Sequence, residues 1–122
     1  MNMKNKYYIY LMIFACNLFA EDMESIYEKT NLANLYIDGG MYEDAIIIYE
    51  NIVDIQKELL GPHHLELVNT LYRLSDLYSL KGNIEKSKTL LYDVVNIQYY
   101  NILLNQKNYI PTFHKLKHLY SL

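Results

Sequence analysis

Residues 32–40 have the sequence LANLYIDGG, and residues 74–82, which lie 42 positions later, have the sequence LSDLYSLKG. A third copy of the pattern, LKHLYSL, begins at Leu116. Two leucines three residues apart and the tyrosine after them suit one face of a helix, and the glycine permits the left-handed backbone in which helices often end. A fixed period of this length predicts stacked helical hairpins rather than a single globular core.

Glycines, prolines and apolar periodicity divide the chain into five predicted helices, over residues 23–38, 42–58, 64–80, 84 to about 103, and 109–122. The small side chains of Ala45 and Ser87, 42 residues apart, predict a close approach of helices at both positions. The side chains predicted to face the core are Met23, Ile26, Tyr27, Leu32, Leu35 and Tyr36, then Ala45, Ile48, Tyr49, Ile52, Val53 and Ile55, then Leu67, Leu71, Leu74, Leu77 and Tyr78, then Ile84, Ser87, Leu91, Val94, Val95 and Ile97, and last Phe113, Leu116, Leu119 and Tyr120.

The first twenty residues stand apart from the repeat. Lys4 and Lys6 precede an apolar run, which ends at Ala20 before a polar, acidic segment. This layout is typical of a secretory signal, and the fourteen residues from Tyr7 to Ala20 fall short of the roughly 20 that a membrane-spanning helix needs. We therefore expect an exported protein, periplasmic or attached to the cell envelope, with secretion as the alternative.

Two ways of processing this segment remain open. Cleavage after Ala20 would release the mature chain, whereas Ile13-Phe14-Ala15-Cys16 resembles a lipoprotein signal, in which Cys16 is acylated and holds the chain to a membrane. Cys16 is the only cysteine, which excludes an intramolecular disulfide and a thiolate metal site.

Composition narrows the function classes. The chain has 122 residues, 52% of them hydrophobic and 20% charged, which suits one small folded domain and argues against disorder. The formal net charge of -3 disfavours nucleic-acid binding. Its serines lack a nucleophile-elbow context and its four glycines form no phosphate loop, so we expect neither an enzyme nor a cofactor.

The repeat resembles the tetratricopeptide repeat family, in the longer variety found in kinesin light chains and many bacterial proteins. The matching positions are Leu32, Ala33, Tyr36, Gly40, Ala45 and Tyr49 in the first unit and Leu74, Ser75, Tyr78, Gly82, Ser87 and Leu91 in the second. The linker Leu60-Gly61-Pro62-His63-His64-Leu65 is similar to the one that joins light-chain units, and its histidines are expected to fix the turn by a hydrogen bond.

The resemblance implies an all-α fold, a short right-handed superhelical stack of antiparallel helix pairs. Residues 21–122 would form this domain, with repeats at about 23–60 and 64–105 and a half-repeat at 109–122. It also implies a protein or peptide partner, bound in a concave groove lined by the first helix of each hairpin. Carried over position by position, the groove residues are Tyr27, Thr30, Asn31, Asn34, Asp38, Tyr72, Arg73, Asp76, Ser79, His114, Lys115 and His118.

Two further functions remain open beside an adaptor or assembly factor. The segment from Glu21 to Glu66 holds eleven acidic residues against two lysines, whereas the segment from Leu67 to Leu122 holds seven basic against three acidic ones, a polarity that could align chains head to tail. The chain could then be a structural piece that completes a homo-oligomer or a larger repeat assembly. His114 and His118, four residues apart, suggest metal binding more weakly, because no carboxylate or thiolate accompanies them.

Overall fold

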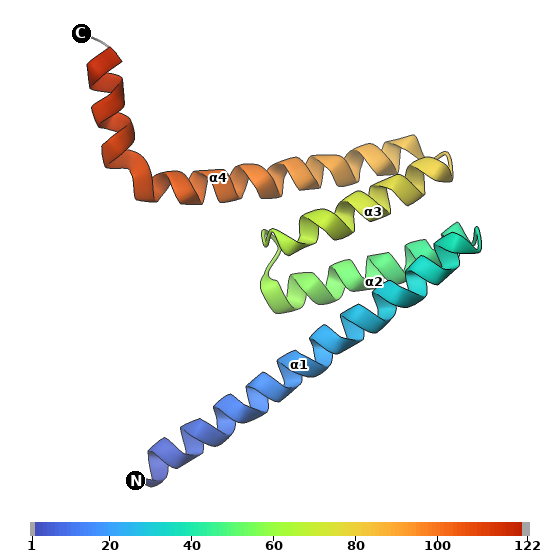
Figure 1. The fold of residues 1–122 in the computed structure, drawn as a ribbon, viewed down its shortest axis with the longest axis horizontal. Coiled ribbons are helices and arrows are strands. Elements are labelled where there is room, and N and C mark those ends of the chain that lie inside the picture. Colours follow the sequence, from blue (N-terminus) through green and yellow to red (C-terminus); the bar gives the residue numbers. More distant parts are fainter. Residues whose placement is uncertain (1, 121–122) are drawn as a thin grey trace.

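The computed structural model describes residues 2–120, with the side chains of residues 2–105 and 118. The regular secondary structure of these residues is entirely α-helical, and short turns connect the helices. Four helices follow one another: α1 (Met3–Asp38), α2 (Tyr42–Leu60), α3 (Glu66–Leu80) and α4 (Ile84–Tyr120). Each helix packs on the next one in the chain, so that α2 and α3 lie inside and α1 and α4 outside (Figure 1). The prediction of stacked antiparallel hairpins is confirmed.

The two hairpin turns are copies of each other. Gly40 and Gly82 have φ angles of +74° and +82°, which glycine adopts without steric cost. After the first, the Met41 amide donates to the Tyr36 carbonyl at 2.8 Å, and after the second the Asn83 amide donates to the Tyr78 carbonyl at 2.9 Å. This is the Schellman arrangement, which satisfies carbonyls left free at a helix end.

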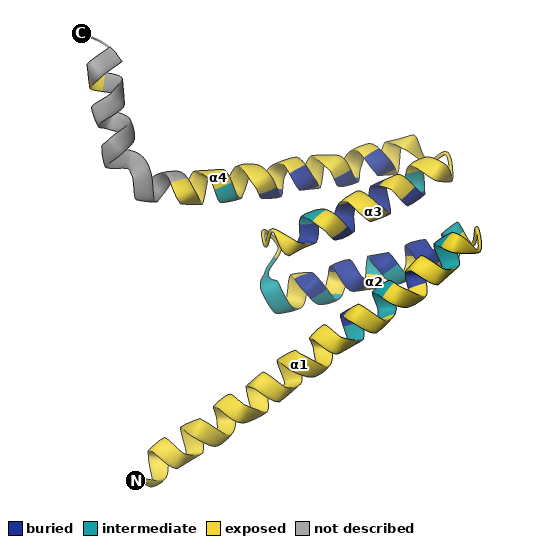
Figure 2. Ribbon diagram, in the orientation of Figure 1, coloured by how far each residue is buried: buried dark blue, intermediate teal, exposed yellow. Residues whose placement is uncertain are grey.

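The core runs through the stack as one cluster, and most of the predicted inward positions of α2 and α3 belong to it (Figure 2). The second repeat shows the predicted close approach of its helices. Ser75 and Ser87 are both buried, and their hydroxyl oxygens are 2.8 Å apart. Ala33 and Ala45, at the equivalent positions of the first repeat, are completely buried. The buried apolar side chains are Ile26, Ala33, Ala45, Ile46, Tyr49, Ile52, Val53, Leu67, Leu71, Leu74, Leu77, Leu90, Val94 and Ile97.

The linker histidines hold the turn between α2 and α3, as predicted for His64. Its Nδ1 accepts a hydrogen bond from the Glu66 amide at 3.2 Å. His63 reaches the last helix instead: its ring stacks on Tyr100 with centroids 4.3 Å apart, and its carbonyl accepts from Asn101 at 2.8 Å. The linker therefore ties the start of the second repeat to α4.

Two predicted helix boundaries are wrong. The first repeat helix does not begin at Met23, because α1 runs without a break from Met3. No separate helix begins at Tyr109, because α4 continues to Tyr120. Neither junction contains a glycine, which ended the other helices, and α4 continues past Pro111 although proline often ends or kinks a helix. The described residues form four helices and not five, although the first part of α1, up to Glu24, is exposed throughout and lies outside the core.

A third correction concerns the two ends of the stack. Leu32, Leu35, Ile84, Leu91 and Val95 were predicted to face the core, but all five are exposed. The repeat unit places such positions against a neighbouring hairpin, and among the described residues no hairpin covers α1 or α4 on these sides. Met23 and Tyr27 are exposed as well.

Candidate protein-binding groove

One side of α1 carries four of the five groove residues predicted there. Tyr27, Asn31, Asn34 and Asp38 are four, three and four residues apart, which places them on a single helix face, and all are exposed. Thr30 lies at the edge of this face. It is half-buried, and its hydroxyl donates to the Ile26 carbonyl at 2.8 Å.

The matching side of α3 carries all four groove residues predicted for the second repeat. Tyr72, Arg73, Asp76 and Ser79 are exposed. The sequence analysis missed Asn69 and Leu80, which are also exposed and share this face. The repeat itself could have found them, since they lie 42 residues after Tyr27 and Asp38. These two residues extend the α3 face by one position at each end.

Tyr49 of α2 connects the two faces. Its buried hydroxyl donates to Oδ1 of Asn34 at 3.1 Å, which fixes this α1 side chain. Burial raises the pKa of Tyr49, and the nearby Arg73 guanidinium of α3 acts in the opposite direction. Asn34 of α1 is therefore bonded directly to Tyr49, and Arg73 of α3 acts on the same residue through its charge.

The third predicted wall of the groove is not a separate helix, because its residues belong to the continuous α4. The side chains of His114 and Lys115 lie outside the described residues, and His118 is exposed. No group of three or more histidine, cysteine, aspartate or glutamate side chains that could hold a metal ion occurs among the side chains that the structure describes.

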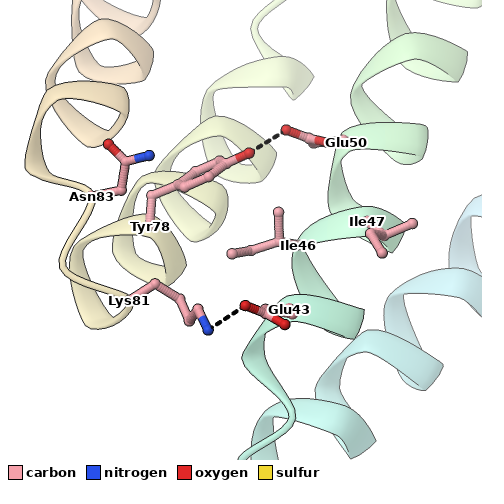
Figure 3. A pocket seen from close by; sticks show the side chains of 7 residues that line it. All are labelled: Glu43, Ile46, Ile47, Glu50, Tyr78, Lys81 and Asn83. Carbon is pink, nitrogen blue, oxygen red and sulfur yellow. Dashed lines mark hydrogen bonds and ion pairs between the residues drawn. The ribbon is translucent and has the colours of Figure 1, made fainter.

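A separate hollow of about 550 Å³ lies between α2 and α3 near the second hairpin turn, away from the groove residues (Figure 3). Two polar links cross it. The Tyr78 hydroxyl donates a short hydrogen bond to Oε1 of Glu50, and Nζ of Lys81 lies 2.6 Å from Oε1 of Glu43. The other lining residues are Ile46, Ile47 and Asn83.

These links shift the pKa of one donor, Tyr78, and of one acceptor, Glu43. The hydrogen bond to Glu50, together with burial and the negative charge of that carboxylate, raises the pKa of Tyr78 to about 12. The bond from Lys81 and its positive charge lower the pKa of Glu43. Both carboxylates that line the hollow therefore have a partner, and the two links join α2 of the first repeat to the second repeat.

The sequence profile of the tetratricopeptide repeat family matches residues 22–99, well over half of the chain. The chain belongs to the tetratricopeptide repeat family. Tetratricopeptide repeats generally mediate protein–protein interactions and serve as scaffolds rather than as catalysts. The matched region covers α2, α3, the whole described core and the groove residues of α1 and α3, and it excludes residues 1–21 and the end of α4. No curated protein matches the chain.

Proposed function

We propose that this tetratricopeptide repeat protein binds an extended protein or peptide segment in the groove between α1 and α3 and acts as an adaptor or assembly factor. The observation that carries the proposal is the hydrogen bond from Tyr49 of α2 to Asn34, because it ties the exposed polar face of α1 to the helix that packs on both α1 and α3.

The chemistry of this surface suits a polypeptide partner. The amides of Asn31, Asn34 and Asn69 can each donate to and accept from the backbone of an extended segment. Arg73 can pair with a carboxylate in two parallel hydrogen bonds, and the rings of Tyr27 and Tyr72 offer large apolar contacts beside these polar groups. Aromatic and arginine side chains of this kind dominate the binding energy of many protein interfaces.

Site-specific photo-crosslinking in expressing cells tests the groove. A photoreactive residue at Tyr72 should capture a defined set of proteins, and the captured bands should weaken at least tenfold when Asn34→Ala and Arg73→Ala are combined in the same chain. The matched control is the same probe at Asn51, an exposed residue of α2 outside the groove. Identical bands from Tyr72 and Asn51 would contradict binding in the groove.

We also propose export to the cell envelope, either as a mature chain cut after Ala20 or as a lipoprotein acylated at Cys16. Support comes from the two lysines ahead of an apolar run and from the exposure of this whole segment outside the core. No helix in the described part of the chain is long and apolar enough to span a membrane. Intact mass spectrometry of the protein from its own cells tests the proposal: the mass should lack residues 1–20, or lack residues 1–15 and carry lipid. A full-length unmodified mass would contradict both.

The period of 42 residues and the Leu60–Leu65 linker support assignment to the light-chain variety of the family. This assignment concerns the geometry of the linker and leaves the nature of the partner unchanged.

A further inference from the structure

Equivalent residues of the two repeats differ sharply in burial at one side of α1. Leu74 and Leu77 of α3 are each 2% exposed, whereas Leu32 and Leu35, 42 residues earlier, are 44% and 65% exposed. Thr70 is buried and its equivalent, Glu28, is exposed. These three α3 residues are four and three residues apart and share one side of that helix, on which Leu74 lines a hollow with Glu50 and Val53 of α2. The corresponding side of α1, which we call the outer face of α1 (Glu28, Leu32 and Leu35), is exposed, and no helix of the described residues covers it.

The same comparison reveals an uncovered side of α4. Tyr49 and Val53 of α2 are 3% and 6% exposed, but Leu91 and Val95 at the equivalent positions of α4 are 39% and 58% exposed. Tyr92 and Tyr99 lie beside them and are also exposed. We call Leu91, Tyr92, Val95 and Tyr99 the outer face of α4. In α2 the equivalent face packs on α3, as the hollow of Figure 3 shows for Glu50.

The two outer faces are therefore the two halves of one interface that the molecule already contains. The packing of α2 on α3 joins the first repeat to the second, and α4 presents the α2 half of that packing while α1 presents the α3 half. The same leucines recur in α1 at the same spacing, and Val95 of α4 repeats Val53. A helix with an apolar side that no neighbour covers normally buries it against another element.

We propose that a second copy of this chain docks its outer α1 face on the outer α4 face of the first copy, and continues the repeat stack head to tail. The equivalence of these two faces to the two halves of the α2–α3 packing favours this partner and this direction.

The docking requires neither the first twenty residues nor the residues of the groove. Residues 28–35 lie beyond the predicted cleavage site, and Asn34 and Arg73 lie on other helix faces, so copies could bind a partner while they are stacked. Each copy has one outer α1 face and one outer α4 face, and the described residues of its own chain cover neither. Such a heterologous contact generates a growing chain or a ring rather than a closed dimer.

Sedimentation equilibrium of the full-length protein over a hundredfold range of concentration tests the proposal. The average mass should rise beyond that of a dimer as concentration increases. Leu35→Asp disables the outer α1 face and Val95→Asp the outer α4 face, so each variant alone should remain monomeric at concentrations where the unmodified protein associates. Both residues are exposed, so circular dichroism should show the helical content unchanged. Ile47→Asp, which removes an equally exposed apolar side chain from α2, is the matched control and should associate normally.

A mixture of the two variants gives the sharper result. Val95→Asp keeps an intact outer α1 face and Leu35→Asp keeps an intact outer α4 face, so an equimolar mixture should form a heterodimer and stop there. A protein that is monomeric at every concentration would overturn the proposal. Association that persists in both single variants would also overturn it, and this is the result expected if the exposed apolar run of residues 7–20 drives association. A mixture that stays monomeric would overturn it as well.

Discussion

Ser75 and Ser87 place two hydroxyl groups where the first repeat has the methyl groups of Ala33 and Ala45. The Ser75 hydroxyl lies 2.8 Å from that of Ser87 and 3.3 Å from the Ser87 carbonyl, and both side chains are buried. Ser75→Ala leaves the Ser87 hydroxyl without this partner in the core, whereas Ser87→Ala leaves the Ser75 hydroxyl with the Ser87 carbonyl as an acceptor. The cost of such an orphaned group is about 1–3 kcal/mol.

We therefore expect Ser75→Ala to lower the free energy of unfolding by about 1 kcal/mol and Ser87→Ala to lower it by less, because the Ser75 hydroxyl keeps the Ser87 carbonyl as an acceptor. The double variant recreates the alanine pair of the first repeat and should cost less than the sum of the two single changes. Urea denaturation of all four proteins measures this coupling. Strict additivity would show that the two hydroxyls do not depend on each other.

Tyr78 should make stability depend on alkaline pH. Its pKa rises from 10.0 in the unfolded chain to about 12 in the fold, because its hydroxyl donates to Glu50. A raised pKa stabilises the folded state fully below the unfolded value, and this contribution is lost as pH rises from about 10 to about 12. Tyr78→Phe should lower the free energy of unfolding by about 1 kcal/mol at neutral pH and flatten this alkaline loss.

Urea denaturation at several pH values measures the effect, and Tyr36→Phe supplies the control. Tyr36 is the equivalent residue of the first repeat and is half-buried, but it makes no hydrogen bond through its hydroxyl to any described residue. An identical pH profile for Tyr78→Phe and the unmodified protein would show that the bond to Glu50 does not hold the phenol protonated.

At the scale of the helices, turn glycines set most of the boundaries. Gly40 and Gly82 were identified from the repeat and end α1 and α3 with left-handed backbone. The two junctions near residues 21 and 104 were predicted wrongly. A change from apolar to acidic residues, or a lost linker motif, does not by itself end a helix, and α4 also continues past Pro111, a residue that often ends or kinks helices.

We expect Gly82→Ala to lower the free energy of unfolding by about 1 kcal/mol, because alanine tolerates a φ of +82° poorly. Gly39→Ala is the matched control. Gly39 has a φ of -82°, which alanine adopts freely, and the nearest side-chain atom to an added methyl group is the flexible end of Met41 at 3.4 Å. Thermal unfolding should separate the two variants, and equal losses would show that backbone conformation is not the cause.

Burial patterns within each helix show what a single sequence can reveal. The inward positions of α2 and α3 were predicted well, since each has a helix on both sides. The burial predicted from the repeat was wrong for Leu35 and Val95. Those positions are buried only where a neighbouring hairpin packs on them, and the structure was needed to show that no described hairpin does so. The groove residues of α1 and α3 were predicted from the resemblance. The hydrogen bond from Tyr49 to Asn34 could be found only from the structure.

At the scale of the whole molecule, the described residues form two complete hairpins. This number is smaller than the roughly three repeats that a tetratricopeptide stack usually needs for stability. Association at the outer faces would supply the missing neighbours. We expect the melting temperature to rise measurably with each tenfold increase in protein concentration, because stability gained from association follows mass action. Leu35→Asp should remove this dependence without lowering the melting temperature of the dilute protein. A melting temperature that is the same at all concentrations would indicate a self-sufficient monomer.

The matched turns at Gly40 and Gly82 also make the protein easy to lengthen by genetic duplication. A tandem copy of residues 42–83 would insert one more α2, one more α3 and their turns, and it would leave both termini as they are. The new junction would set the Ser75 hydroxyl opposite the methyl group of Ala45, and one serine-to-alanine change would repair that mismatch. Longer descendants of this chain are therefore a few genetic steps away.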